Sequence, residues 1–158
     1  MMIDINLKFR NKQELLFKKT HYYIKIPIIL EPESRFNEPI SFIVDTGAFL
    51  TVINKRTAKR CKLDLLPVKT KDYQLGGFAG STKVDLIKVP QFILGDRTIT
   101  DVVVAIPQIE TTQNILGLNV LEYFKFYIDT DENYIYFQDS DEYKIEDTYR
   151  CGEILTLE

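Results

Sequence analysis

Short runs of β-branched and aromatic residues, separated by glycine, proline and aspartate, constrain the fold of this chain most strongly. β-Branched and aromatic residues favour extended, half-buried backbone, whereas Gly, Pro and Asp favour turns. Pro27, Pro90 and Pro107 interrupt or border the runs, as expected at strand ends and sheet edges. The predicted strands are Tyr22–Leu30, Ile40–Asp45, Lys83–Val89, Gln91–Leu94, Ile99–Ile106 and Tyr134–Gln138.

Helical patterns are confined to two short segments. One is Asn54–Cys61, whose first residue is a candidate N-cap. The other is Leu118–Lys125, in which Val120, Leu121 and Phe124 form a predicted buried face. Many short strands with one or two small helices predict an all-β (mostly β) fold, a barrel or a sandwich.

The length and charge of the chain limit its organisation and its partners. A chain of 158 residues fits one domain. We expect a core over about residues 22–138, with peripheral extensions at 1–21 and 139–158. The net charge of −3 gives no reason to expect nucleic acid or an anionic membrane as a partner. No apolar run is long enough for a membrane span and the first residues lack a signal-peptide core, so the expected location is cytoplasmic.

The cysteines and the histidine do not indicate a metal site or a nucleophilic enzyme. Cys61 and Cys151 make no disulfide framework and lack the partners of a zinc site. His21 is the only histidine, and its place beside two tyrosines at the start of an apolar run favours a surface or packed side chain. The sequence therefore predicts no metal and no cofactor.

Two charged segments have simple structural interpretations. Asp129–Asn133 has the D-x-D-x-N spacing of a calcium loop, but Tyr134 stands where such loops need glycine and Ser140 stands where they need glutamate. A polar hairpin turn is the better interpretation. A basic cluster on the first predicted helix is interpreted as a solvated face; its members are Lys55, Arg56, Lys59, Arg60 and Lys62.

The segment Ser41–Ile53, with the sequence SFIVDTGAFLTVI, carries the chemistry. A buried strand ends at Asp45 and leads into a tight turn, after which an apolar strand resumes. Thr46 can hydrogen-bond within the turn, and Gly47 lets the backbone approach the carboxylate closely. A backbone N–H that reaches this carboxylate would hold it in place and stabilise its charge.

Two further segments follow in a recognisable order. Tyr73–Thr82 places three glycines in the composition of a hairpin tip, and Ile115-Leu116-Gly117 leads into the second predicted helix. Together with the Asp45–Ala48 turn, these segments resemble the retropepsin-like (retroviral-type) aspartic proteases. The closing hairpin, FYID to NYIYFQ, also resembles bacterial members of this family. The resemblance covers roughly residues 22–138 and implies the barrel-like acid-protease fold.

The resemblance also implies a role for each matching residue. Asp45 would be the catalytic carboxylate, Thr46 would join hydrogen bonds that lock two such turns together, and Gly47 would position the turn. Ile115 and Leu116 would pack beneath it. The implied substrate-binding residues are Ala48, Phe49, Gly76, Gly77, Phe78 and Ala79, of which the last four would lie on a flap that closes over the substrate.

One further expectation concerns the substrate. Phe49, Tyr73 and Phe78 lie in segments expected near the cleft. We therefore expect apolar or aromatic side chains in the substrate.

A single Asp-Thr-Gly occurs in the chain, whereas hydrolysis by this chemistry uses two carboxylates. One carboxylate activates the attacking water, and the other, protonated, donates to the developing oxyanion. A symmetric homodimer would supply the second carboxylate. The expected function is an aspartic endopeptidase acting on peptide or protein substrates. The alternative is a catalytically silent module of the same fold that dimerises or binds peptides.

Overall fold

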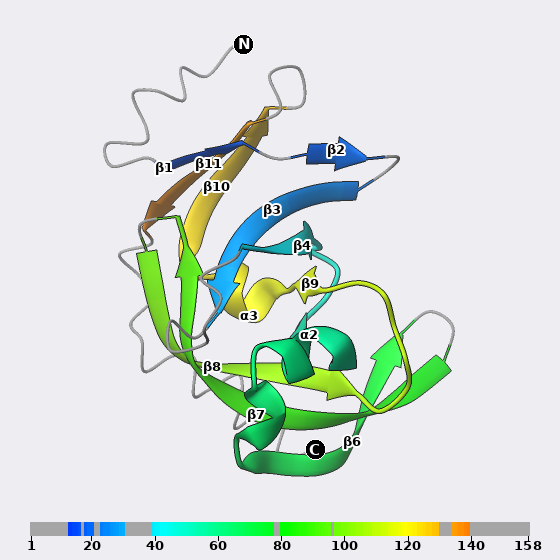
Figure 1. Ribbon diagram of the computed structural model, residues 1–158. Coiled ribbons are helices and arrows are strands. Elements are labelled where there is room, and N and C mark those ends of the chain that lie inside the picture. Colours follow the sequence, from blue (N-terminus) through cyan, green and yellow to red (C-terminus); the bar gives the residue numbers. More distant parts are fainter. Residues whose placement is uncertain are drawn as a thin grey trace.

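The computed structural model describes residues 13–16, 18–20, 23–30, 39–77, 80–95, 97–129 and 134–139. Most of this part of the chain is extended (Figure 1). The strands are β1 (Gln13–Leu16), β2 (Lys18–Thr20), β3 (Tyr23–Leu30), β4 (Ile40–Val44), β5 (Thr51–Val52), β6 (Val68–Gly77), β7 (Gly80–Leu94), β8 (Arg97–Pro107), β9 (Ile115–Leu116), β10 (Phe124–Asp129) and β11 (Tyr134–Asp139). The helices are α2 (Lys55–Arg60), the 3₁₀ helix η1 (Leu63–Leu65) and α3 (Leu118–Leu121).

Six of these strands close into a barrel. Backbone pairing runs in the order β3, β4, β9, β5, β8, β7, and β7 returns to pair with β3. β2 and β6 extend this sheet beyond the ring, while β1, β11 and β10 form a separate three-stranded sheet (Figure 1). The predicted fold, a mostly-β closed barrel with one or two short helices, is therefore confirmed for the described residues.

Pro27 and Pro90 both stand inside strands, as predicted for Pro27 within Tyr22–Leu30 but not for Pro90, which was expected to separate two strands. The segments predicted as separate strands on either side of Pro90 form one strand, β7. β7 pairs with β6 up to Ile87 and with β3 from Phe92, so among the described strands only β8 lies beside it at Pro90. Pro27 lies in the corresponding gap of β3, between its pairing with β2 and its pairing with β7. A missing N–H is tolerated where a strand has one neighbour, as at a sheet edge.

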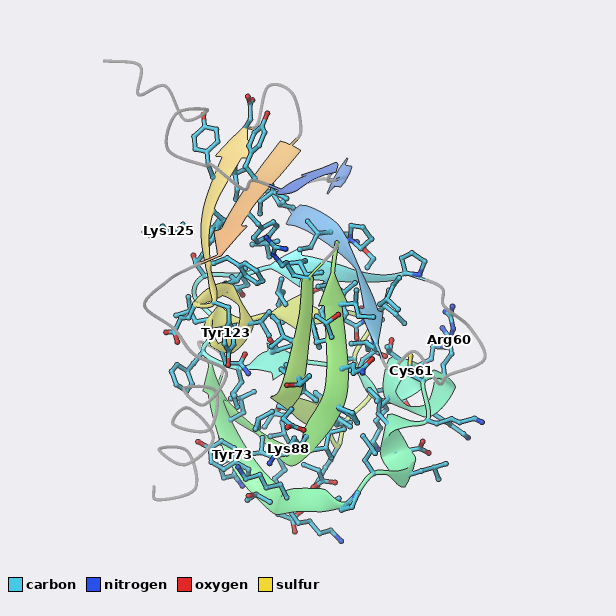
Figure 2. The ribbon with its side chains drawn as sticks, turned by 90° about the vertical axis from the view of Figure 1, so that its left-hand side faces the viewer. Arg60, Cys61, Tyr73, Lys88, Tyr123 and Lys125 are labelled. Atoms are coloured by element: carbon cyan, nitrogen blue, oxygen red, sulfur yellow. The ribbon has the colours of Figure 1, made fainter. Side chains whose placement is uncertain are left out.

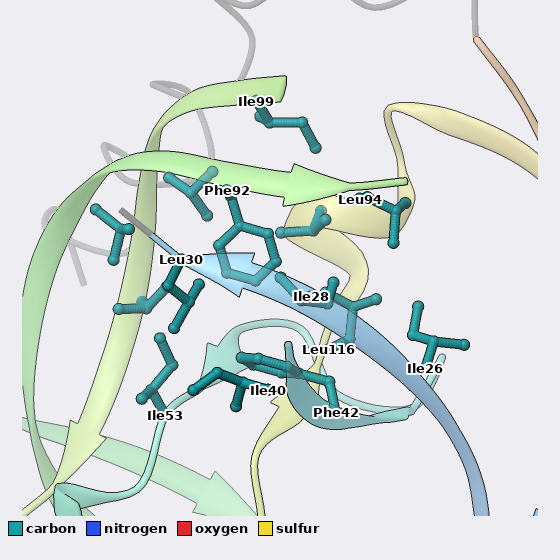
Figure 3. Packing of buried hydrophobic residues seen from close by; sticks show 14 of the residues in the cluster. Ile26, Ile28, Leu30, Ile40, Phe42, Ile53, Phe92, Leu94, Ile99 and Leu116 are labelled. Carbon is teal, nitrogen blue, oxygen red and sulfur yellow. The ribbon is translucent and has the colours of Figure 1, made fainter. Parts of the chain in front are cut away.

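The barrel interior is filled by side chains from segments far apart in the sequence (Figure 3). Phe42 and Phe92 are fully buried and pack edge to face, with ring centroids 5.5 Å apart. Phe92 lies on β7 and Phe42 lies on β4, the strand that leads into the Asp45 turn. Because a close-packed interior resists displacement, this contact fixes the strand that delivers Asp45.

One helix prediction is confirmed and one is wrong in its second half. Asn54 caps α2, since its Oδ1 accepts from the backbone N–H of Thr57 at 2.8 Å. The helix expected over Leu118–Lys125 ends at Leu121, and Phe124 already pairs in the hairpin of β10 and β11. The face formed by Val120, Leu121 and Phe124 is buried as predicted. Aromatic residues from Phe124 onward favour the strand, which ends the helix early.

The basic cluster on and just after α2 is exposed, as predicted for a solvated face. Figure 2 shows Arg60 at the surface beside Cys61, whose side chain turns inward. None of the helices in the described residues has the length and apolar character that crossing a membrane requires. His21, Cys151 and residues 130–133 of the segment predicted as a hairpin turn lie outside the described residues.

Cys61 gives a first testable expectation. Burial raises the pKa of its thiol above the usual value, against a smaller lowering by the neighbouring Arg60 charge. Since the thiolate is the reactive form, Cys61 should react slowly with a disulfide reagent at pH 8. We expect a Cys151→Ser variant to label about a hundredfold more slowly when folded than in guanidinium, where opening of the fold no longer limits access. Equal rates in both conditions would contradict the burial of this thiol.

Candidate active site

Asp45 lies at the point where β4 leaves the barrel wall. β4 runs parallel to β9, and the pairing places Val44 opposite Leu116. The backbone N–H of Asp45 then donates to the carbonyl of Leu116 at 3.1 Å. Strands β4 and β9 therefore hold the backbone of Asp45 in place up to the start of the turn.

The turn itself closes around the Asp45 carboxylate. The backbone N–H of Gly47 donates to Asp45 Oδ1 at 2.8 Å, and that of Ala48 donates to the Asp45 carbonyl at 3.2 Å. A Cβ added at Gly47 would lie 3.1 Å from Oδ1, so glycine is favoured by this close approach. The carboxylate is half-exposed, so it is fixed in orientation and still reached by solvent.

The segment after the turn is bonded to the N-terminal end of α3. The carbonyls of Ala48 and Phe49 accept from the backbone N–H groups of Leu118 and Asn119, at 2.8 and 3.1 Å. Gly117 lies against this segment so closely that an added Cβ would stand 2.5 Å from the carbonyl carbon of Leu50. The resemblance had Ile115 and Leu116 pack beneath the turn, and they do form the adjacent strand, with Leu116 fully buried.

A buried network behind the turn was not predicted. Asn119 Oδ1 accepts from the backbone N–H and the hydroxyl of Thr51, at 2.8 and 2.9 Å. Asn119 Nδ2 donates to the carbonyl of Val103 at 2.7 Å, and the Thr51 hydroxyl accepts from the N–H of Gly117 at 3.0 Å. Thr51 and Asn119 are both buried, and each hydrogen bond satisfies a group that water cannot reach. Three separate segments are thereby fixed to one another behind Asp45.

Removing the Thr51 hydroxyl tests this network. A Thr51→Val variant keeps the shape of the side chain but leaves the Gly117 N–H without its acceptor. We expect a loss of about 1–3 kcal/mol in the free energy of unfolding, the usual effect of an unsatisfied buried group. Thr98→Val is the matched control, because Thr98 lies exposed on β8. Urea unfolding of both variants measures the difference, and equal stabilities would contradict the role of the network.

A second network fixes α2 to the strand that precedes the turn. Asn114 donates its Nδ2 to the Thr57 hydroxyl at 3.1 Å and accepts from the backbone N–H of Asn54 at 2.9 Å. Its own carbonyl accepts from the N–H of Ile43 at 2.8 Å. The sequence signal available for this role was an asparagine just before the apolar pair Ile115 and Leu116. In the structure this asparagine is buried, and both polar atoms of its side chain are hydrogen-bonded to neighbouring segments.

The predicted hairpin exists and packs over a small apolar cluster close to the turn. β6 and β7 pair down to Gly77 opposite Gly80, whose φ of +120° favours glycine. Tyr73 and Leu75 of β6 pack against a cluster that also contacts Ile115; Figure 2 shows Tyr73 in the lower part of the molecule. The buried members of this cluster are Leu50, Val52, Val84, Leu86, Val103 and Ala105.

Four of the other predicted site residues are exposed at the surface, and two lie outside the described residues. Thr46 is exposed, and the side chain of Phe49 is 41% exposed. Gly76 and Gly77 lie exposed at the end of β6, with open space around the position of an added Cβ at Gly76. Phe78 and Ala79 lie outside the described residues.

The arrangement offers one rigid, solvent-accessible carboxylate. Asp-Thr-Gly occurs once in the sequence. Among the described residues, no group of three or more His, Cys, Asp and Glu side chains is placed to hold a metal ion. A carboxylate of this kind can accept a proton from water, but a carbonyl would need a second, protonated group to polarise it.

Comparison with known proteins identifies what this geometry resembles. Residues 36–123 match the family model described as "gag-polyprotein putative aspartyl protease". A retropepsin-like aspartic protease from Rickettsia conorii has a similar fold, with a TM-score of 0.59, 22% identity, and coverage of 80% of this chain and 90% of that one. The retroviral protease-like domain of Ddi1 from Leishmania major gives a TM-score of 0.53 at 22% identity, covering 79% and 98%. No curated protein matches the chain in sequence.

Proposed function

The chain belongs to this retropepsin-like family of aspartyl proteases, and we propose that it is an endopeptidase whose active site combines two copies of the Asp45 turn. The proposal rests chiefly on the hydrogen bond from the Gly47 N–H to Asp45 Oδ1. This bond fixes the carboxylate at the end of a barrel strand, where its second oxygen can face a water molecule.

The proposed mechanism needs two such carboxylates sharing one proton. Close like charges make double ionisation costly, so one carboxyl stays protonated while the other is ionised. The ionised Asp45 takes a proton from the attacking water as the water adds to the scissile carbonyl. The protonated Asp45 donates a hydrogen bond to the oxygen that becomes negatively charged. No metal or cofactor takes part in this proposal.

The second carboxylate comes from a symmetric homodimer. One chain supplies one Asp-Thr-Gly, and a two-fold axis beside the turn brings identical turns face to face. In this arrangement Thr46, which is exposed, bonds to the partner turn, and Gly47 positions the carboxylate. The exposed Thr46 supports this placement, because the turn is open to a partner.

The substrate lies between the turn and the hairpin. Ala48 and the exposed ring of Phe49 contact the substrate on the side of the turn, and the flap closes from the other side. Gly76, Gly77, Phe78 and Ala79 form the flap tip in this proposal. The apolar cluster that Tyr73 and Leu75 cover supports a preference for apolar substrate side chains. Cleavage of a peptide library without any preference for apolar side chains would contradict this part of the proposal.

Cleavage of an unstructured protein tests the proposal. Denatured casein is incubated with the purified chain from pH 3.5 to 7.5, and the oligomeric state is measured by light scattering at each protein concentration. We expect specific activity to rise with protein concentration as the dimer forms. Activity that is independent of concentration in a monomeric sample would contradict the dimeric site. Peptide binding without turnover at any pH would instead support a silent binding module.

A further inference from the structure

The β6–β7 hairpin projects beyond the strand that supports it. β7 pairs with β8 as far as Val84 opposite Pro107, where β8 ends. Beyond that point, in the part of the chain that the structure describes, β6 and β7 pair only with each other, from Gln74 opposite Lys83 to Gly77 opposite Gly80. These pairs form a two-stranded arm, which appears in green at the lower right of Figure 1. Because β8 does not pair with the arm, the contacts at the base of the arm determine the direction in which it projects.

Gln108, the residue after β8, binds both strands at this base. Its backbone N–H donates to the carbonyl of Lys83 on β7 at 3.0 Å. Its side-chain Nε2 donates to Asp72 Oδ1 on β6 and to Asp85 Oδ1 on β7, the latter at 3.1 Å. The two hydrogens of the amide group can therefore serve two carboxylates on two different strands.

The backbone of β6 is adapted to this contact. The pairing of β6 with β7 is irregular between Thr70 and Tyr73, and Asp72 has a φ of 55°. This left-handed conformation is uncommon in a strand and is best tolerated by Gly, Asn and Asp. It turns the Asp72 N–H toward Asp85 Oδ1, which accepts it at 3.2 Å. Two carboxylates thus lie close to one amide group, and that group offsets their mutual repulsion.

We propose that Gln108 is a positioning residue that holds the base of the arm through Asp72 and Asp85, and so sets how readily the arm opens for a polypeptide substrate. The inference rests on the proposed function for its catalytic consequence. Gln108 does not touch the reacting atoms; it acts through β6, whose Leu75 packs on the cluster near the Asp45 turn. Loss of the amide donor removes the group that the two carboxylates share and leaves Asp85 Oδ1 with only the Asp72 N–H, so the repulsion between the carboxylates pushes the two strands apart at the base.

A Gln108→Glu variant tests the arm directly. The substitution keeps the size of the side chain but replaces the donor with a third acceptor. Gln113→Glu is the matched control, because Gln113 is exposed in the same connection between β8 and β9 and adds the same charge. Hydrogen exchange of the backbone amides in peptides spanning Gln74–Ser81 is measured on the unbound protein. We expect exchange to rise about five- to tenfold in Gln108→Glu, the factor of an average hydrogen bond, and to change less than twofold in the control.

Kinetics then separate positioning from a general loss of structure. The expected change is a rise in KM of about threefold or more with kcat within twofold, because the arm holds substrate without taking part in bond breaking. If Gln108→Glu does not fold, Asp72→Gly replaces it, since glycine accepts the φ of 55° and removes the acceptor. Equal exchange in the variant and the control overturns the inference. Hydrogen exchange can be measured even if the protein cleaves no substrate. The positioning role of Gln108 and the proposed endopeptidase function can therefore be contradicted independently.

Discussion

The Asp45→Asn variant is expected to lose peptide hydrolysis by about 10²–10⁴-fold, the usual contribution of a positioned acid or base. Asparagine has nearly the same shape, and its Oδ1 can still accept the Gly47 N–H that fixes the turn. The fold and the dimer should therefore remain. The amide can neither take a proton from water nor hold the shared proton. Hydrolysis is therefore lost although the geometry of the turn is kept.

Asp64→Asn is the control for this comparison. Asp64 is exposed in the 3₁₀ helix η1, and the substitution changes the net charge by the same amount. Initial rates on casein and thermal unfolding of both variants are measured together. Wild-type rates in Asp64→Asn with none in Asp45→Asn assign the chemistry to Asp45. Retained activity in Asp45→Asn would place the reaction elsewhere in the molecule.

The second large effect concerns stability at Gly117. A Cβ at this position would lie 2.5 and 2.6 Å from the carbonyl carbon and oxygen of Leu50, and 2.9 Å from the nitrogen of Thr51. These are backbone atoms of the segment that follows the Asp45 turn, so they cannot move aside as a flexible side chain would. We expect Gly117→Ala to lower the free energy of unfolding by about 3 kcal/mol or more, the upper range for overpacking. The Tm should fall by roughly 6–12 °C for a domain of this size.

Gly76→Ala provides the contrast for Gly117→Ala, since a Cβ added at Gly76 meets nothing within 4 Å. Its stability should stay within about 0.5 kcal/mol of the wild type, as for most exposed substitutions. Thermal and urea unfolding measure both variants. A Gly117→Ala protein as stable as Gly76→Ala would contradict the close approach of α3 to the turn.

Local patterns were enough to predict the parts of the site that lie close together in sequence. The turn from Asp45 to Ala48, the N-cap at Asn54 and the glycine hairpin each depend on residues only a few positions apart. The short apolar runs predicted a mostly-β barrel or sandwich, and the family resemblance implied the closed barrel. These features could be predicted because turn formation and strand preference depend on residues close together in the sequence.

Features that join distant segments could not be predicted from one sequence. Thr51 and Asn119 are 68 positions apart, and neither pattern nor composition pairs them. Strand β6 was missed because its residues are mostly exposed, so it lacks an apolar alternation. The single strand through Pro90 depends on which neighbours β7 has at that point, which only the topology decides. The early end of α3 reflects pairing of Phe124 with β11.

Mixing active and inactive chains is the most direct test of an active site shared by two copies of Asp45. Wild-type and Asp45→Asn chains are combined at constant total concentration, allowed to exchange, and assayed on casein. If both carboxylates are needed, mixed dimers are inactive and activity follows the square of the wild-type fraction; an equal mixture keeps about one quarter of the full rate. A rate that falls in simple proportion, to about one half, would show that each chain acts alone and would contradict the proposed site.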